Sequence, residues 1–170
     1  MKRLQLNRKN HCTSALIIAF LLIVVFSTNT QAGGVIRWMT QTIYVPLYSH
    51  IYADERYRDK PFNLTATLSI RNTDPENGLV LQNVDYYDSA GKLLEKYLDK
   101  PVTIAPLAST RFIVQESESK GGSGAKFIVI WTAAKPVVEP IIESVMIGTK
   151  LQQGISFLSR GKVIAGESAD

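Results

Sequence analysis

The feature that most constrains the fold is the ten-residue segment 62–71, in which apolar and polar residues alternate strictly. Every second side chain from Phe62 onward is apolar, and the intervening positions carry asparagine, threonine, serine and arginine. This period of two matches an extended strand with one buried face and does not fit the 3.6-residue period of a helix. The segment therefore predicts a half-buried β-strand, and the Asp-Pro and Asn-Gly pairs in residues 72–78 predict a turn after it.

The chain beyond residue 41 continues as short runs of the same kind, separated by turn residues. Residues 79–87 and 92–98 predict a hairpin, and residues 127–131 are apolar on both faces, as in a central strand that is covered on each side. No ten-residue window has the apolar stripe of an amphipathic helix. The other expected segments are an extended link at 101–106, strands at 110–116, 141–149 and 155–160, and a flexible glycine-rich loop at 119–125.

About eight or nine short strands without helices are typical of an antiparallel, all-β sandwich. We predict an immunoglobulin-like β-sandwich over residues 41–164, with a short lead at 33–40 and a polar, frayed tail at 165–170. Because Cys12 is the single cysteine and precedes this region, an apolar core has to stabilise the sandwich in place of a disulfide.

The first 32 residues have the composition of a secretory signal peptide. Basic residues without any acidic one precede an apolar run at 15–26, and Ala32 ends the polar stretch that follows. We expect a signal-peptide helix that is cleaved after Ala32, which places the mature protein in the periplasm or cell envelope. The alternative is an uncleaved anchor in the inner membrane, although residues 15–26 are shorter than the roughly 20 residues that a spanning helix needs.

Removal of this leader also removes the excess of positive charge. The full sequence has 19 basic and 15 acidic side chains, a net charge of +4. Four of the basic residues lie in the leader, so the mature chain is neutral. A neutral charge distribution and an export signal both argue against nucleic acid as a partner. The four leader residues are Lys2, Arg3, Arg8 and Lys9.

Five blocks of the mature chain resemble one bacterial family, the domain of unknown function 3124. The blocks are QTIYVPLYSHIY, FNLTATLSIRNTDPENG, VDYYDSAGKLLEKYL, APLASTRFIVQESESKGGSGAKFIVIW and PIIESVMIGTKLQQGISFLSRG, within residues 41–164. The resemblance implies a small, single-domain protein that is exported or linked to the envelope. It implies no activity, cofactor or catalytic residue that could be transferred to this chain.

Catalytic motifs are sparse after residue 32. The segment around Ser123 resembles a nucleophile elbow, but the residues after it predict a strand where the elbow requires a helix. His50, the single histidine beyond the leader, would have to act as the base. We therefore predict a loop without catalytic residues, and the alternative is a hydrolase whose site is assembled only in the fold. The loop residues are Gly121, Gly122, Ser123 and Gly124.

Metal ligands are equally scarce, because one histidine and no cysteine leave almost no donors for zinc or a softer metal. Carboxylates that could bind calcium or cleave a glycoside occur in three groups, but acidic residues in turns are normally solvated. We predict no metal site and no cofactor. The groups are Asp54, Glu55 and Asp59; Asp85 and Asp88; and Glu116 and Glu118.

The most suggestive binding feature is a row of aromatic side chains that an extended strand would place on one side. Pro46 lies within the row and favours an edge strand, because proline donates no hydrogen bond to a sheet. Tyrosine combines apolar area with a polar tip, which suits contacts with protein or sugar. The alternative is that the row packs in the core, as we expect for Trp131. The row consists of Tyr44, Tyr48, His50 and Tyr52.

Together these features predict an exported, non-enzymatic module that binds an envelope protein or a glycan, without membrane contact in its mature form. The expected contact surfaces are the edge strand at residues 41–52 and the glycine-rich loop. Two alternatives stay open. One is the hydrolase, and the other is a structural subunit of an envelope assembly.

Overall fold

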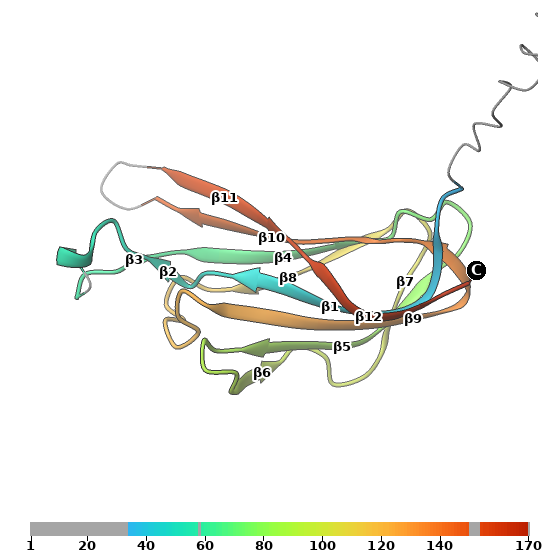
Figure 1. Ribbon diagram of the computed structural model, residues 1–170, viewed down its shortest axis with the longest axis horizontal. Helices are drawn as coiled ribbons and strands as arrows, with labels where there is room; N and C mark the ends of the chain where they lie inside the picture. The colour runs from blue at the N-terminus through green and yellow to red at the C-terminus, as the bar shows by residue number, and fades with distance from the viewer. Residues whose placement is uncertain (1–33, 58, 150–153, 170) are drawn as a thin grey trace, which may run out of the picture. The chain divides into compact units, whose positions relative to one another are not determined.

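The alternating segments form twelve β-strands in a computed structural model that describes residues 34–57, 59–149 and 154–169 (Figure 1). The predicted signal peptide lies outside these residues. Every strand pair is antiparallel, and the 3-10 turn η1 (Glu55–Tyr57) is the sole helical element that the structure describes. The described residues contain no helix with the length and apolar character that a membrane crossing needs.

The larger sheet has six strands in the order β12-β1-β9-β5-β6, and β7 also pairs with β5. Its central strand contains residues 127–131, as predicted. Burial alternates along that strand, so Val129 and Trp131 are buried while Ile128 and Ile130 are only half-buried. One face of the strand is therefore covered, not both. The strands are β1 (Arg37–Leu47), β5 (Leu79–Tyr87), β6 (Leu93–Lys96), β7 (Val102–Ile104), β9 (Ala125–Val138) and β12 (Lys162–Ser168).

The smaller sheet has four strands in the order β11-β10-β4-β8. The alternating segment supplies β4, where Leu68 and Ile70 are buried and Thr67 lies on the opposite face. The first two residues of that segment instead form β3 (Phe62–Asn63), which pairs with β2 (His50–Ile51) in a separate two-stranded sheet. The four strands are β4 (Thr65–Arg71), β8 (Ser109–Val114), β10 (Ile141–Gly148) and β11 (Ile155–Arg160).

The inward faces of the two main sheets share one apolar core, which lies between the two layers of strands in Figure 1. Trp131 and Phe127 of β9 are fully buried in this core together with Leu68 of β4 and Met146 of β10. The predicted core position of Trp131 is confirmed. The all-β, antiparallel prediction is confirmed as well.

The structure corrects the predicted ends of the domain. β1 begins at Arg37, inside the expected lead, and β12 continues to Ser168, through most of the expected frayed tail. β12 crosses over to the larger sheet and pairs with β1, for example Gly166 with Gln41 (Figure 1). An edge strand is ordered by this backbone ladder, so its side chains can be polar and show no alternation. The structure has twelve strands in place of eight or nine. β12 was not predicted, β2 and β3 are separate from the longer strands expected at 41–52 and 62–71, and the extended link at 101–106 forms β7.

Candidate functional site

The predicted tyrosine row does not form one face. β1 lies between β12 and β9, so it is an interior strand and not the predicted edge strand. Tyr44 sits on the outer face of the larger sheet, opposite Lys162 on one side and Ile128 on the other. Pairing with β12 stops at Tyr44, which leaves Pro46 without a partner on that side and explains why a proline is tolerated there.

The rest of the row separates after Leu47, where the chain leaves the larger sheet to form β2. Tyr48 packs against the core and meets Phe157 edge-on at 5.5 Å between ring centroids, so it follows the core alternative. The Nε2 atom of His50 lies 3.0 Å from the hydroxyl of Tyr52, and the two rings meet edge-on. His50 and Tyr52 therefore form a pair at the β2–β3 sheet, away from Tyr44.

The glycine-rich loop is held by hydrogen bonds and is not the flexible loop that the sequence predicted. The Gly122 amide donates to Ser49 Oγ at 2.9 Å, and the Ser49 amide donates to the Gly122 carbonyl at 3.1 Å. The Ser89 amide donates to the Gly121 carbonyl at 2.9 Å. Gly121 is buried, and a Cβ atom at this position would overlap the hydroxyl of Tyr86. The glycines thus allow close packing of the loop on two neighbouring segments.

The structure does not assemble a serine–histidine pair from Ser123 and His50. The Nδ1 atom of His50 lies 3.1 Å from Ser49 Oγ, and its Nε2 atom is engaged with Tyr52. Ser123 is exposed and makes no hydrogen bond to His50 in the described part of the chain. The nucleophile and base that a hydrolase of this kind needs are therefore not in contact.

Two of the acidic residues singled out in the sequence, Asp54 and Asp88, stabilise turns. Asp54 accepts hydrogen bonds from the side chain and the backbone amide of Arg56, which lower the pKa of Asp54. Asp88 accepts from the amides of Ala90 and Lys92, at 2.9 and 2.8 Å. Across residues 34–57, 59–149 and 154–169, no group of three or more histidine, cysteine or acidic side chains is placed to hold a metal ion.

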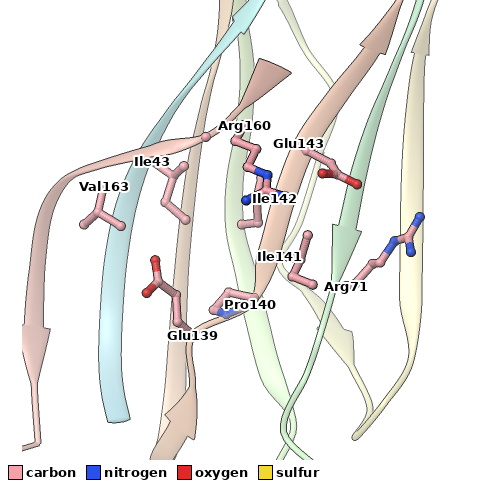
Figure 2. Close-up of a pocket in the computed structure, with 10 residues that line it drawn as sticks. Ile43, Arg71, Glu139, Pro140, Ile141, Ile142, Glu143, Arg160 and Val163 are labelled. Atoms are coloured by element: carbon pink, nitrogen blue, oxygen red, sulfur yellow. The ribbon is translucent and has the colours of Figure 1, made fainter. Parts of the chain in front are cut away.

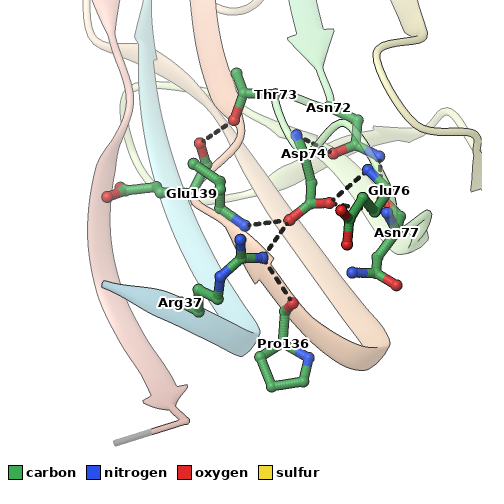
Figure 3. Close-up of polar contacts among 9 residues, drawn as sticks. Arg37, Asn72, Thr73, Asp74, Glu76, Asn77, Pro136 and Glu139 are labelled. Atoms are coloured by element: carbon green, nitrogen blue, oxygen red, sulfur yellow. Dashed lines mark hydrogen bonds and ion pairs between the residues drawn. The ribbon is translucent and has the colours of Figure 1, made fainter. Parts of the chain in front are cut away.

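A buried carboxylate that the sequence reading treated only as part of a turn is Asp74 (Figure 3). Its Oδ2 atom lies 2.8 Å from Arg37 Nη1 and 3.0 Å from the Val138 amide, while Oδ1 accepts from the amides of Glu76 and Asn77. Burial alone would raise the pKa of Asp74, but the three amide hydrogen bonds and the charge of Arg37 outweigh it and lower the pKa to about 2. These contacts join β1, the end of β9 and the β4–β5 loop, so Asp74 is a structural residue.

Two hollows that are lined by arginine lie beside the smaller sheet. The first is a cleft of about 510 Å³ where the chain crosses from β11 to β12 (Figure 2). Arg71 and Arg160 line it together with Glu139 and Glu143, so its positive and negative charges balance. This cleft therefore has no net preference for a charged ligand.

The second hollow, of about 620 Å³, lies on the outer face of the smaller sheet. In the described part of the chain, the guanidinium groups of Arg71 and Arg111 have no carboxylate partner, and Arg71 Nε donates to Ser69 Oγ at 3.2 Å. Leu107 forms part of the rim; it is 69% exposed and has a φ of 56°, which is costly for a residue other than glycine. We call this site the arginine hollow. Its lining residues are Thr67, Ser69, Arg71, Leu107, Ser109, Thr110, Arg111 and Val145.

Strand register arranges the outer face of the smaller sheet in rows of directly opposed residues. A row that is apolar except at Thr67 crosses all four strands, and its ends, Leu158 and Ile113, are 54% and 48% exposed; we call it the apolar row. A charged row runs beside it and ends at the arginine hollow. The apolar row is Leu158, Val145, Thr67 and Ile113, and the charged row is Arg160, Glu143, Ser69 and Arg111.

The largest group of exposed, large hydrophobic side chains in the described part of the chain lies on this face. Of the eleven exposed ones in the described part of the chain, five lie on the outer face of the smaller sheet or at the rim of its hollow. On the outer face of the larger sheet, Tyr44, Ile128 and Ile130 are half-buried. The five exposed residues are Leu107, Ile113, Ile141, Ile147 and Leu158.

A model of a family described as "Protein of unknown function (DUF3124)" matches residues 40–164. The chain belongs to this family. The DUF3124 region covers the smaller sheet and most of the larger one, and it includes the arginine hollow and both rows. A comparison with curated proteins gives no match. Among solved structures, the chain is similar to the one titled "Crystal Structure of Thermotoga maritima 1070", with 12% identity, a TM-score of 0.41, and coverage of 75% of this chain and 97% of that one.

Proposed function

We propose that this DUF3124 protein is an exported, non-enzymatic binding module that docks an envelope protein through the outer face of its smaller sheet. In this proposal residues 1–32 are a signal-peptide helix that is cleaved after Ala32, and residues beyond it form an immunoglobulin-like β-sandwich in the periplasm or cell envelope.

The proposal is carried by the apolar row, whose ends are exposed, and by the two arginines beside it that have no carboxylate partner among the described residues. Contiguous apolar side chains on a surface mark interaction sites, and protein interfaces combine an apolar centre with arginine. The apolar row has this character because Leu158 and Ile113 remain exposed at its ends. Arg111 and Arg71 lie beside it without a carboxylate partner in the described chain.

The chemistry of the face favours a protein over a glycan. The apolar row offers aliphatic surface and few hydrogen-bonding groups, so sugar hydroxyls packed on it would lose hydrogen bonds to water. Three arginines and one glutamate line the neighbouring positions, which favours a partner with acidic groups around an apolar patch. These four residues are Arg71, Arg111, Arg160 and Glu143. The hydrolase alternative has less support, because Ser123 and His50 do not meet.

Exchange of Leu158 for glutamate tests this function, and Ile164→Glu is its matched control. The two side chains are 54% and 55% exposed on edge strands of different sheets, so the two substitutions have similar effects on folding. Tagged full-length protein is cross-linked in the producing cells and the adducts are identified. We expect an acidic protein partner with the wild type and with Ile164→Glu, and its loss with Leu158→Glu.

An adduct that persists unchanged in Leu158→Glu would overturn the proposal. So would an adduct that consists of glycan alone, because that result selects the other class of partner.

A further inference from the structure

We infer that the free edge of β8 takes up an extended segment of the docked protein, which adds as a fifth strand and places an acidic side chain opposite Arg111. This inference rests on the proposed function, because it specifies how the partner is held. It concerns the edge of the smaller sheet that borders the arginine hollow.

The backbone of β8 is open on this side except at Ile113, whose carbonyl is contacted by Tyr97. β8 pairs with β4 and with no other strand among the described residues. The Asn72 amide donates to the Ala108 carbonyl at 2.9 Å, which extends the β4–β8 ladder by one residue. Backbone groups point to alternate sides along an antiparallel strand, so the even-numbered residues face β4. Ser109, Arg111 and Ile113 therefore direct their amides and carbonyls away from β4.

A contact of Tyr97 agrees with this assignment. Its hydroxyl donates to the carbonyl of Ile113 at 3.4 Å, as expected for a carbonyl that points away from β4. The amide of Ile113 and both backbone groups of Ser109 and Arg111 stay available for a new strand. Edge strands with this arrangement are templates for strand addition.

The rows of the outer face determine which side chains the new strand should carry. In the charged row, Glu143 already lies opposite Arg160, so an acidic residue opposite Arg111 would repeat an existing pairing of opposite charges. The apolar row favours an apolar residue opposite Ile113. The hydroxyl of Ser109 and the guanidinium of Arg71 favour a small polar residue opposite Ser109.

All pairs in this sheet are antiparallel, so we expect an antiparallel addition. Read from its amino end, the docked segment then has an apolar, an acidic and a small polar residue at every second position. A second copy of β8 does not fit. Antiparallel pairing of two β8 strands through Ser109, Arg111 and Ile113 would place Arg111 of one copy opposite Arg111 of the other. The two guanidinium groups would then repel each other.

Peptide binding to the full-length protein tests the inference directly. The probe is an end-blocked, fluorescein-labelled peptide, Thr-Val-Thr-Glu-Thr-Ser-Thr, and the control peptide has lysine in place of glutamate. Fluorescence anisotropy should show saturable binding of the first peptide and binding at least about tenfold weaker for the second. The Arg111→Glu protein should reverse this preference.

Backbone pairing has its own test, which leaves the protein unchanged. A residue opposite Arg111 exchanges both of its backbone hydrogen bonds with β8, so N-methylation of the peptide glutamate should abolish binding. N-methylation of the next threonine, whose amide points to solvent, should leave binding within about twofold.

A protein variant complements this measurement. Ile113→Pro removes an outward amide without breaking the β4 ladder, and Ile113→Ala is its control. Ile113→Pro should lose binding while Ile113→Ala keeps it, with equal thermal melting for both.

Equal affinity for the glutamate and lysine peptides, absence of binding, or full binding of the peptide methylated at glutamate would each overturn strand addition. Failure here is distinguishable from failure of the proposed function. If a Leu158-dependent partner is still cross-linked in cells, docking on this face stands and only the β8 mechanism is wrong.

Discussion

At the scale of single residues, Asp74 shows how one buried carboxylate can order a connection between sheets. Its oxygen atoms accept hydrogen bonds from the amides of Glu76, Asn77 and Val138 and from Arg37 (Figure 3). Charged acceptors in such positions make stronger hydrogen bonds than neutral ones. The ionised form of Asp74 is therefore part of the folded structure.

Stability should consequently fall in acid. The pKa of Asp74 is lowered to about 2 from a usual value of 3.8, so the unfolded chain takes up the proton first as the pH falls. The contribution of Asp74 is complete above about pH 4 and is lost as the pH falls towards 2. Asp74→Asn should cost about 2 kcal/mol at pH 7 and reduce this acid-dependent loss.

Urea unfolding at pH 7, 4 and 2.5 measures the effect of Asp74→Asn. Asp88→Asn is the control, because Asp88 also accepts two amide hydrogen bonds but lies in a surface turn. If the two variants had the same stability at every pH, the role of Asp74 would be disproved.

The close packing of Gly121 against the side chain of Tyr86 can also be tested at the scale of single residues. The Tyr86 hydroxyl is buried without a hydrogen-bond partner among the described residues, and burial, followed by the charges of Glu118, Asp88 and Glu95, raises the pKa of Tyr86 to about 12. Gly121→Ala would overlap this hydroxyl and should cost about 1–3 kcal/mol. Tyr86→Phe should be nearly neutral and should reduce the cost of Gly121→Ala. A double-mutant cycle measures this coupling, and additive effects would contradict it.

At the scale of elements, the sequence predicted those strands whose side chains alternate between a buried and an exposed face. β4 and β9 have core-facing side chains at every second position, so their existence is visible in the sequence. β12 is largely exposed, and its order comes from pairing with β1, which lies 118 to 130 residues earlier in the chain. Lys162 is opposite Tyr44, and Ser168 is opposite Trp38. Pairing between segments so far apart leaves no pattern in the local amino-acid sequence from which the strand could be predicted.

Removal of residues 165–170 tests the assignment of β12. The sequence reading of a frayed tail expects no change, whereas the structure shows Gly166, Glu167 and Ser168 paired with β1. Loss of these hydrogen bonds should cost about 1–3 kcal/mol and accelerate amide exchange in residues 38–42. Removal of Asp170 alone is the control. Unchanged exchange in the longer truncation would support a frayed tail after all.

The candidate site could not be predicted for a related reason. The apolar row combines Thr67, Ile113, Val145 and Leu158 from four separate strands. Each of these residues occupies a polar-facing position in its own strand, where a single exposed apolar side chain is unremarkable. The tyrosine row, in contrast, was visible in the sequence but is divided by the break after Leu47.

At the scale of the whole molecule, the proposed function expects export to remove residues 1–32 as a leader, which would change the chain that is present in the cell. The leader contains four basic residues of the 19 in the sequence, and the rest of the chain is neutral. We expect intact-mass measurement of the protein from its producer to show Gly33 as the first residue, and an isoelectric point below the value of 9.2 for the full sequence. Recovery of the uncleaved chain in the membrane fraction would favour the anchor alternative.

The two outer faces of the sheets have different expected roles. The face of the smaller sheet carries the arginine hollow and the apolar row, whose ends Leu158 and Ile113 are exposed, while Tyr44, Ile128 and Ile130 on the larger sheet are all half-buried. We assign partner docking to the smaller sheet and place none on the other face.

The most direct test places a photo-cross-linking amino acid at Val145 in the apolar row or, as the control, at Ile128. Both are aliphatic residues on central strands, one on the outer face of each sheet. Illumination of the producing cells should yield a protein adduct from position 145 and none from position 128. An adduct from position 128 alone, or none from position 145, would contradict docking through the smaller sheet.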